Sequence, residues 1–328
     1  IRSNLVYDLQ KKFNVVVMLP NVKSKIEEEL KDNGLNVIKP YQDSWPPYLN
    51  FIHTLLNYAH NRKLGLWHIA QWQYDFHLSN SRAKIFLFII NIFSFCFQFN
   101  TMYNILKKIF QNKVYKFCMI SKNNRLIEKI SPDLIISTNA YELDEIVISI
   151  IAQQKKIETY GSIISWDNLS YKGFIIPSFN KYLVWSDLMK NELVLSDDKI
   201  QKDNIFSLSS IQFDFHFRKE MVWSKRRFYK YLGLNNDNKI LLYSASSNLH
   251  FIREPEFVEK ICERILDGEF FGQPNLILRI HPHDNTDRFD YLTGKYPFLH
   301  VIRPWKKNEK YYWWFEPSTD DIALLTNC

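Results

Sequence analysis

The stretch Pro274–Ile280 (PNLILRI) runs directly into His281-Pro282-His283-Asp284 (HPHD), and this junction decides how the chain is interpreted. The first part has the continuous apolar character of a strand buried on both faces of a parallel sheet. Open α/β sheets bind ligands outside the carboxyl ends of their strands, where the two histidines lie. An unperturbed histidine side chain has a pKa near neutrality, so His281 and His283 suit a general acid, a general base or a phosphate partner. The alternative, left open by the segment alone, is a polar turn broken by Pro282.

The segments around this strand extend the same pattern. Strands are predicted at 239–243 and 299–302, and Pro255 opens a helix that ends near Leu266. The residues after the first of these strands include Ser244, Ser246, Ser247 and Asn248. Small hydroxyl residues there let backbone N–H groups approach a phosphate, although the loop lacks the glycine pattern of a P-loop or dinucleotide fingerprint.

The first part of the chain also alternates strands and helices. Strands are predicted at 14–19, 35–38, 133–138, 159–165, 182–185 and 204–208. Helices are predicted at 24–32, 141–154 and 187–195, the last capped by Ser186 and Asp187. The alternation predicts parallel sheets with right-handed crossovers. We therefore expect an α/β protein with one domain at 1–208, a linker at 209–237 and a second domain at 238–328.

Residues 48–130 interrupt the alternation with a long aromatic region that we predict to be helical. Within it, 85–99 (IFLFIINIFSFCFQF) is almost entirely apolar. A helix of that length spans about 22 Å, short of the ~30 Å hydrocarbon core of a bilayer. The favoured interpretation is a buried helix. The alternative is a helix that dips into a membrane surface, flanked by Arg82, Lys84, Lys107 and Lys108.

Composition restricts the class of protein. A chain of 328 residues with 46% hydrophobic content is globular and long enough for two domains. The net charge of +7 suits anionic ligands such as nucleotides, or an anionic membrane surface, and its scattered Lys/Arg pairs form no nucleic-acid footprint. The four cysteines are widely separated and the histidines lack metal spacing. We expect a cytoplasmic protein with reduced thiols, no metal site and no cofactor.

Both ends of the sequence resemble cuts. The chain begins with Ile1, and a helix predicted to start near Thr319 stops at Cys328. We expect a piece of a longer protein, with the first strand of one sheet and the last strands of the other outside it. Such a piece should be inactive by itself.

Two strand ends of the first domain carry further polar groups. The residues after the strand at 159–165 include Trp166, Asp167, Asn168 and Lys172. There the indole suits stacking on a ring, the carboxylate suits proton acceptance and the ammonium suits a phosphate; an Asx turn is the alternative. After the strand at 133–138, Asn139 suits contact with an acceptor hydroxyl, but helix capping is the favoured explanation.

Several of these segments together resemble a known family. They are 165–173 (SWDNLSYKG), 184–193 (VWSDLMKNEL), 212–214 (QFD) and 279–283 (RIHPH). In combination they are similar to GT-B-fold glycosyltransferase-like proteins of bacterial surface-polysaccharide biosynthesis, relatives of the CDP-glycerol glycerophosphotransferases and of the UDP-N-acetylglucosamine 2-epimerase group. The resemblance covers about residues 133–328 and extends only loosely to the helical region before them.

The resemblance implies two tandem Rossmann-like domains of GT-B type, both truncated here, that face each other across a cleft. His281-Pro282 matches a His-Pro pair implicated in catalysis, so His281 is expected to act as a base or to stabilise the diphosphate leaving group. Donor phosphate would be held by Arg279, His283 and the loop Ser244–Asn248. The relatives commonly have Gly and Pro where this chain has Ser209 and Ile211, so the crossover between the domains is expected to differ.

The acceptor side is expected on the first domain. Its residues would be Asn139, Trp166, Asn168 and Lys172, with Asp167 as a second catalytic group. The resulting hypothesis is a glycosyl- or polyol-phosphate transferase that uses a nucleotide-activated donor and a glycan or lipid-linked acceptor, in the cytoplasm or at the inner face of the plasma membrane. The alternatives are a nucleotide-sugar 2-epimerase-like enzyme, and a non-catalytic glycan-pathway protein attached to the membrane through 85–99.

Overall fold

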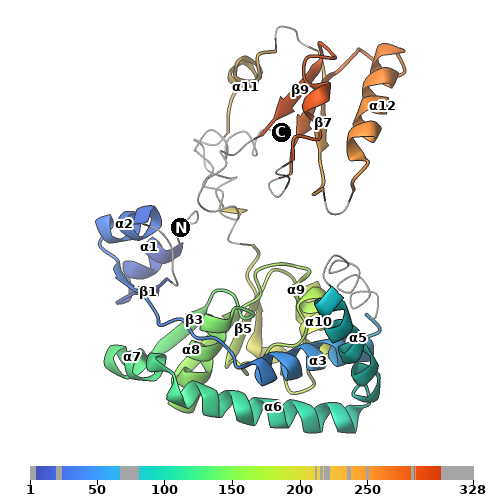
Figure 1. The fold of residues 1–328 in the computed structure, drawn as a ribbon. Helices are drawn as coiled ribbons and strands as arrows, with labels where there is room; N and C mark the ends of the chain where they lie inside the picture. The colour runs from blue at the N-terminus through green and yellow to red at the C-terminus, as the bar shows by residue number, and fades with distance from the viewer. Residues whose placement is uncertain are drawn as a thin grey trace. The chain divides into compact units, whose positions relative to one another are not determined.

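The computed structural model describes residues 5–19, 24–66, 81–210, 213–214, 217, 222–234, 238–248, 251–281, 284 and 286–303. The chain divides into two compact units, Ser3–Ile211 and Gln212–Cys328. The described strands form three sheets, and every strand pairing in them is parallel (Figure 1). The predicted α/β class with parallel sheets is therefore confirmed.

The first unit begins with a small sheet of its own. After α1 (Leu5–Gln10), β1 (Val16–Met18) pairs with β2 (Asn36–Ile38), and α2 (Ser24–Asp32) connects them. Among the described residues these two strands pair only with each other. The described strands of residues 1–208 thus form two separate parallel sheets, with a long helical segment between them in the sequence.

That helical segment comprises α3 (Pro47–Lys63), α5 (Ser81–Cys96), α6 (Asn100–Ile120) and α7 (Lys122–Ile130). The prediction that this region is helical is confirmed for its described part. α6 packs against α3 and against the sheet-covering helix α8 (Leu143–Gln154) (Figure 1). Phe110 and Val114 of α6 are fully buried in this core. α5 packs against α3 through Leu87 and Ile90, which meet Leu55 and Tyr58.

The interpretation of 85–99 as a buried helix is wrong for most of its length. Ile85, Phe88 and Ile92 are 63%, 56% and 54% exposed. Only Leu87, Ile90 and Ser94 are buried in the described part of α5. These three positions are three and four residues apart, so they lie on one side of the helix. No described helix combines the length and the apolar character needed to cross a membrane.

The main sheet of the first unit follows. Its strands are β3 (Leu134–Ser137), β4 (Glu158–Ser162), β5 (Lys181–Val184) and β6 (Ile205–Ser207), in that order across the sheet. α8 connects β3 to β4, α9 (Asn168–Tyr171) follows β4, and α10 (Asp187–Ser196) connects β5 to β6 through η1 (Lys202–Asn204). The predicted cap of α10 is confirmed, because the Ser186 hydroxyl accepts a hydrogen bond from Met189 N at 3.3 Å.

The second unit contains the strand that leads into His281. Its elements are α11 (Lys225–Leu232), β7 (Ile240–Ser244), α12 (Glu254–Leu266), β8 (Asn275–Arg279), η4 (Asp290–Leu292) and β9 (Leu299–Ile302). β8 lies between β7 and β9. Its residues Leu276, Ile277 and Leu278 are all buried, as predicted for a strand covered on both faces.

Candidate functional site

In the second unit, the carboxyl ends of β7 and β8 lie side by side. Ser244 stands opposite Arg279 in the parallel register, and Ala245 N donates to Arg279 O at 2.9 Å. The chain therefore brings the serine loop and His281 to the same edge of the sheet. His281 is half-buried, and its carbonyl accepts a hydrogen bond from Asp284 N at 2.9 Å. His283, predicted to bind donor phosphate, lies outside the described residues.

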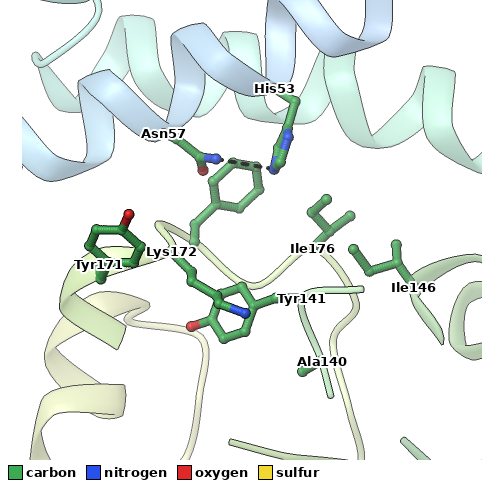
Figure 2. A pocket seen from close by; sticks show the side chains of 9 residues that line it. His53, Asn57, Ala140, Tyr141, Ile146, Tyr171, Lys172 and Ile176 are labelled. Atoms are coloured by element: carbon green, nitrogen blue, oxygen red, sulfur yellow. Dashed lines mark hydrogen bonds between the residues drawn. The ribbon is translucent and has the colours of Figure 1, made fainter. Parts of the chain in front are cut away.

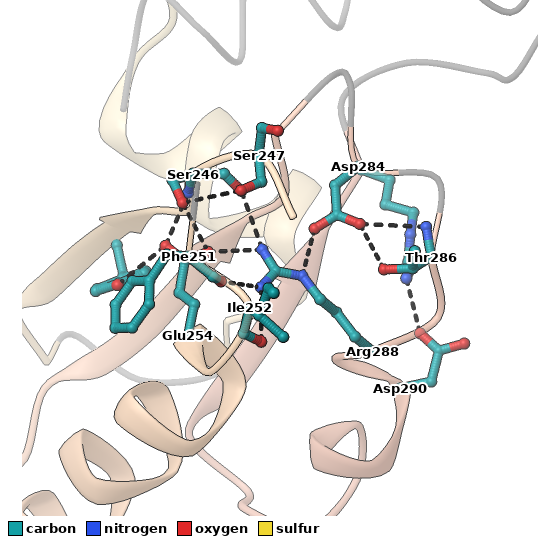
Figure 3. Close-up of polar contacts among 11 residues, drawn as sticks. Ser246, Ser247, Phe251, Ile252, Glu254, Asp284, Thr286, Arg288 and Asp290 are labelled. Carbon is teal, nitrogen blue, oxygen red and sulfur yellow. Dashed lines mark hydrogen bonds and ion pairs between the residues drawn. The ribbon is translucent and has the colours of Figure 1, made fainter. Parts of the chain in front are cut away.

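Arg288 binds both sides of this edge (Figure 3). Its Nε lies 2.6 Å from Asp284 Oδ2, and its Nη2 lies 2.7 Å from Glu254 Oε2. The guanidinium also donates to the backbone carbonyls of Phe251 at 2.6 Å and Ser246 at 3.0 Å. Since both carboxylates are buried, these charge-assisted bonds fix the loops after β7 and β8 against each other.

Glu254, at the start of α12, holds the serine loop. Its carboxylate accepts from Ser246 N at 2.8 Å, from the Ser246 hydroxyl at 3.2 Å and from the Tyr243 hydroxyl at 3.1 Å. Burial, reinforced by the negative charge of Glu254, raises the pKa of Tyr243 to about 12. The Ser246 hydroxyl also lies 3.3 Å from the Ser247 carbonyl oxygen, which is a second acceptor for its proton. Ser247 beside it is buried, whereas Ser244 is exposed.

Asp284 has a structural role that the sequence left open. Besides Arg288, its carboxylate accepts from Thr286 N at 3.1 Å and from the Thr286 hydroxyl at 2.6 Å. These bonds form an Asx-type turn at Asp284, which agrees with the alternative interpretation of this segment as a polar turn. Sequence reasoning missed Glu254 and Arg288. Glu254 immediately precedes the helix-opening Pro255, but no pattern in the sequence connects Arg288 to it.

In the first unit, Asn139 belongs to the turn between β3 and α8. Its side-chain oxygen accepts from Tyr141 N at 3.3 Å, and its amide nitrogen donates to Glu142 Oε1 at 3.3 Å. Glu145 binds the same turn, accepting from Asn139 N at 2.8 Å and from the Ser137 hydroxyl at 2.8 Å. Both ends of the Asn139 amide are thus engaged locally, in an Asx-type turn. The expected helix cap by Asn139 is wrong, because Glu142 is the N-cap residue of α8 and no side chain caps this helix.

The predicted acceptor residues in the segment after β4 lie in different environments. The Asp167 carboxylate accepts a short hydrogen bond from the Ser165 hydroxyl, and Trp166 is 69% exposed. Asn168 is buried, and its side-chain oxygen has no hydrogen-bond partner among the described residues. Of the predicted acceptor-side residues, Lys172 alone lines a pocket described in the structure.

This pocket has a volume of about 240 Å³ and lies between α3 and the loops that follow β3 and β4 (Figure 2). Figure 2 shows His53 and Asn57 on the α3 side, with Tyr141 and Lys172 opposite them. The remaining lining residues are Ala140, Ile146, Tyr171, Phe174 and Ile176. The Lys172 ammonium lies 5.7 Å from the centre of the Tyr141 ring, which places a cation in a largely apolar hollow.

His53 is held in the pocket as a neutral ring. It stacks on Phe110 with centroids 5.8 Å apart and meets the edge of Trp45 at 4.9 Å. Burial lowers its pKa to about 4, so the imidazole is uncharged at neutral pH. Asn57 Nδ2 lies 3.2 Å from His53 Nε2, and this geometry suits a neutral ring that accepts the hydrogen bond through Nε2.

Two polar atoms of the pocket residues have no partner among the described residues, namely the Tyr141 hydroxyl and Asn57 Oδ1. Burial raises the pKa of Tyr141, which keeps the phenol protonated. Unpaired buried polar groups are costly, so such atoms in a hollow favour a ligand or water as the missing partner. Sequence reasoning missed His53 and Asn57 because both lie in the helical region, away from any strand end.

Gly173 allows α3 to approach this loop. Its φ is +86°, and a Cβ atom at this position would lie 2.3 Å from Asn57 Oδ1.

Another position with a backbone typical of glycine occurs before the second unit. Ser209 has φ +61°, a left-handed conformation that favours glycine, and glycine is the residue that the family resemblance implies there. Among the described residues, no cluster of three or more His, Cys, Asp or Glu side chains is arranged to hold a metal ion.

No protein-family model matches this chain, and no curated protein matches it. Its fold is similar to that of UDP-GlcNAc 2-epimerase from Neisseria meningitidis bound to UDP-GlcNAc, at 14% identity over 60% of this chain and 55% of that one, with a TM-score of 0.37. The UDP-GlcNAc 2-epimerase from Methanocaldococcus jannaschii gives 16% identity over 66% and 58%, with a TM-score of 0.40. A glycosyltransferase from Rickettsia africae gives 11% identity over 87% and 59%, with a TM-score of 0.43. The chain spans 55% to 59% of the length of these three structures.

Proposed function

We propose that the complete protein transfers a sugar or a polyol phosphate from a nucleotide-activated donor to a cell-surface glycan or its lipid-linked precursor. His281 acts as the general base or stabilises the diphosphate leaving group. Arg279, His283 and the loop Ser244–Asn248 hold the donor phosphates. Positioning and charge stabilisation supply most of the rate enhancement in such transfers.

The observation that carries the proposal is the position of His281 just beyond β8, a central parallel strand that is buried from Asn275 to Leu278. Ligands of such sheets bind at this edge. The chain adjoining His281 is held by Arg288, through Asp284 at 2.6 Å and Glu254 at 2.7 Å. A catalytic side chain must be held in place to be effective, and this network holds the two loops at the sheet edge where His281 lies.

The pocket of the first unit supplies the acceptor side of the proposal. At about 240 Å³ it is smaller than the roughly 300–1,000 Å³ typical of whole-ligand sites, so it suits one ring or one polyol unit. Lys172, the Tyr141 hydroxyl and Asn57 offer a cation and polar atoms to hydroxyl or phosphate groups. Asp167, with Trp166 and Asn168 nearby in the loop, is assigned to the rim of this site.

Replacement of His281 in the complete protein tests the assignment. His281→Gln should reduce transfer about 10²–10⁴-fold while donor binding is largely kept, because general acid–base groups contribute about that much. His300→Gln, a half-buried histidine of β9 in the same unit, is the matched control and should leave transfer near the wild-type rate. Wild-type turnover by His281→Gln would refute the role.

A nucleotide-sugar 2-epimerase-like activity is distinguished by its substrate requirement. An epimerase converts the nucleotide-sugar without an acceptor, whereas a transferase needs one. Incubation of the complete protein with a panel of nucleotide-sugars and CDP-polyols, with and without acceptor glycan, separates the two. If product forms without acceptor, and His281→Gln abolishes it, the activity is epimerisation and not transfer. Donor binding without any product would favour the non-catalytic alternative.

A further inference from the structure

α5 presents an apolar surface that nothing in the described structure covers. Seven large apolar residues of this helix are exposed: Ile85, Phe86, Phe88, Ile89, Ile92, Phe93 and Phe95. Phe99 just beyond the helix is 60% exposed. Single exposed apolar residues are normal on proteins, but a contiguous group of this size marks a binding surface.

The structure separates the two sides of α5 clearly. Leu87, Ile90 and Ser94 contact α3 and its surroundings, and Arg62 of α3 donates to the Ser94 hydroxyl at 2.9 Å. Ile85, Phe88 and Ile92 repeat at three and four residues, so they form a second stripe on an exposed side. α6 continues the exposed apolar surface in sequence with Met102, Ile105 and Ile109.

The positive charge of the chain around α5 favours an anionic partner. Residues 76–127 contain no Asp or Glu, and they contain eight basic residues: Arg82, Lys84, Lys107, Lys108, Lys113, Lys116, Lys122 and Arg125. The segment thus carries +8 against +7 for the whole chain, so the rest of the chain sums to −1. Lys107 is paired with Asp197 at 2.6 Å, whereas Lys108, Lys113 and Lys116 are exposed on α6.

We propose that α5 and the basic segment around it form an interfacial docking surface for an anionic lipid bilayer. The exposed Phe and Ile side chains of α5 enter the boundary between headgroups and acyl chains, and the lysines of α6 contact anionic headgroups. A second copy of the chain is disfavoured as the partner, since two segments of charge +8 would repel each other. This inference concerns where the protein binds and does not depend on the proposed transfer reaction.

Vesicle flotation tests the surface directly. The purified chain should float with vesicles of phosphatidylglycerol mixed with phosphatidylcholine, float less with phosphatidylcholine alone, and dissociate as salt is raised. The variant Ile85→Glu/Phe88→Glu/Ile92→Glu should lose at least about tenfold in partitioning, because three apolar side chains no longer enter the interface. Its thermal unfolding should match the wild type, since these side chains are exposed.

A matched control places the same charges on exposed apolar residues elsewhere: Leu188→Glu/Leu195→Glu/Phe271→Glu. These positions are 69%, 76% and 91% exposed, so the control should float like the wild type. The proposal is overturned if the wild type does not float, if the α5 variant floats normally, or if the control loses as much. Light scattering would also overturn it if the wild type dimerises through α5 without binding vesicles and the α5 variant is monomeric.

Discussion

Two helices of the first unit, α8 and α5, are both strongly apolar in sequence but have opposite environments. In α8, the consecutive residues from Ile146 to Ala152 are all buried. In the described part of α5, three positions are buried and the rest of the apolar face is exposed. The difference comes from the connections, because α8 joins two parallel strands and must lie on their sheet, whereas α5 joins helices and contacts α3 on one side. Apolar composition therefore indicates burial only when the topology supplies a second surface.

The largest expected effect is a difference in the free energy of unfolding between two variants, each with one charge placed in one of these helices. Ile151→Asp in α8 puts a carboxylate in a fully buried site, and we expect it to lower the free energy of unfolding by at least about 4 kcal/mol. Phe88→Asp in α5 should change it by less than about 0.5 kcal/mol. Urea unfolding followed by circular dichroism measures both. Equal losses would show that the α5 surface is covered in solution.

Acid should lower the stability of the first unit through His60, a residue of α3 that faces α6. Burial, together with Lys107 and Lys63, lowers the pKa of His60 to about 4, and its Nδ1 lies 3.2 Å from the Tyr103 hydroxyl. In the unfolded chain His60 takes up a proton near pH 6.5, whereas in the folded chain it does so only near pH 4. The contribution of His60 to the free energy of unfolding is therefore fully present above pH 6.5, and it falls by about 3 kcal/mol as the pH drops to 4.

Urea midpoints measured across this pH range test the effect of His60. The variant His60→Gln should have a flatter profile than the wild type, since it removes the proton that only the unfolded state accepts. The half-buried His53 contributes in the same direction and remains in both proteins, so the difference between the two profiles isolates His60. Parallel profiles would contradict the assignment.

Neighbouring isoleucines within α5 sharpen the comparison inside one helix. Ile90 is fully buried and Ile89 is 40% exposed. Ile90→Ala should cost about 2 kcal/mol, at the low end for core truncations because one side of the helix is open to relaxation. Ile89→Ala should cost well under about 1 kcal/mol. Thermal unfolding of the two variants under the same conditions compares their losses of stability. A larger loss for Ile89→Ala than for Ile90→Ala would reverse the assignment of the packed face.

The smallest expected effects come from one buried serine in each helix. The Ser94 hydroxyl of α5 accepts from Arg62 Nε at 2.9 Å and donates to Asn91 O at 2.8 Å, so Ser94→Ala should cost about 1 kcal/mol. The Ser149 hydroxyl of α8 is buried without a partner among the described residues, so Ser149→Ala should be neutral or stabilising by up to about 1 kcal/mol. Ser94→Ala should therefore lower the denaturant midpoint, whereas Ser149→Ala should leave it unchanged or raise it.

Strand positions were the part of the fold that the sequence predicted well. The predicted strand at 299–302 matches β9, and β8 was placed within one residue, because buried parallel strands have continuous apolar runs. The separation of β1 and β2 into their own sheet could not be predicted, since period and composition do not specify which strands pair. The exposure of α5 was missed for the same reason, because it depends on which helices are neighbours.

The candidate sites were predicted only in part. Strand ends located the serine loop, His281 and Lys172, since polar residues after apolar runs are visible in sequence. Glu254, Asp284 and Arg288 meet through contacts that join the loops after β7 and β8, and Arg288 lies 34 residues from Glu254. His53 and Asn57 reach the pocket from α3, a helix that sequence reasoning treated as an insertion. Both sets depend on tertiary neighbours and not on any local pattern.

The missing side chain at Gly173 has a consequence for how the pocket could evolve. Its contact with Asn57 sets the spacing between α3 and the loop after β4, although Gly173 itself offers no polar group to a ligand. Any larger residue at 173 would be strained at this φ and would have to displace Asn57, which itself lines the hollow. The width of the hollow is therefore set in part by a residue that contributes no binding group, so a substitution at 173 would reshape the hollow through Asn57 and α3.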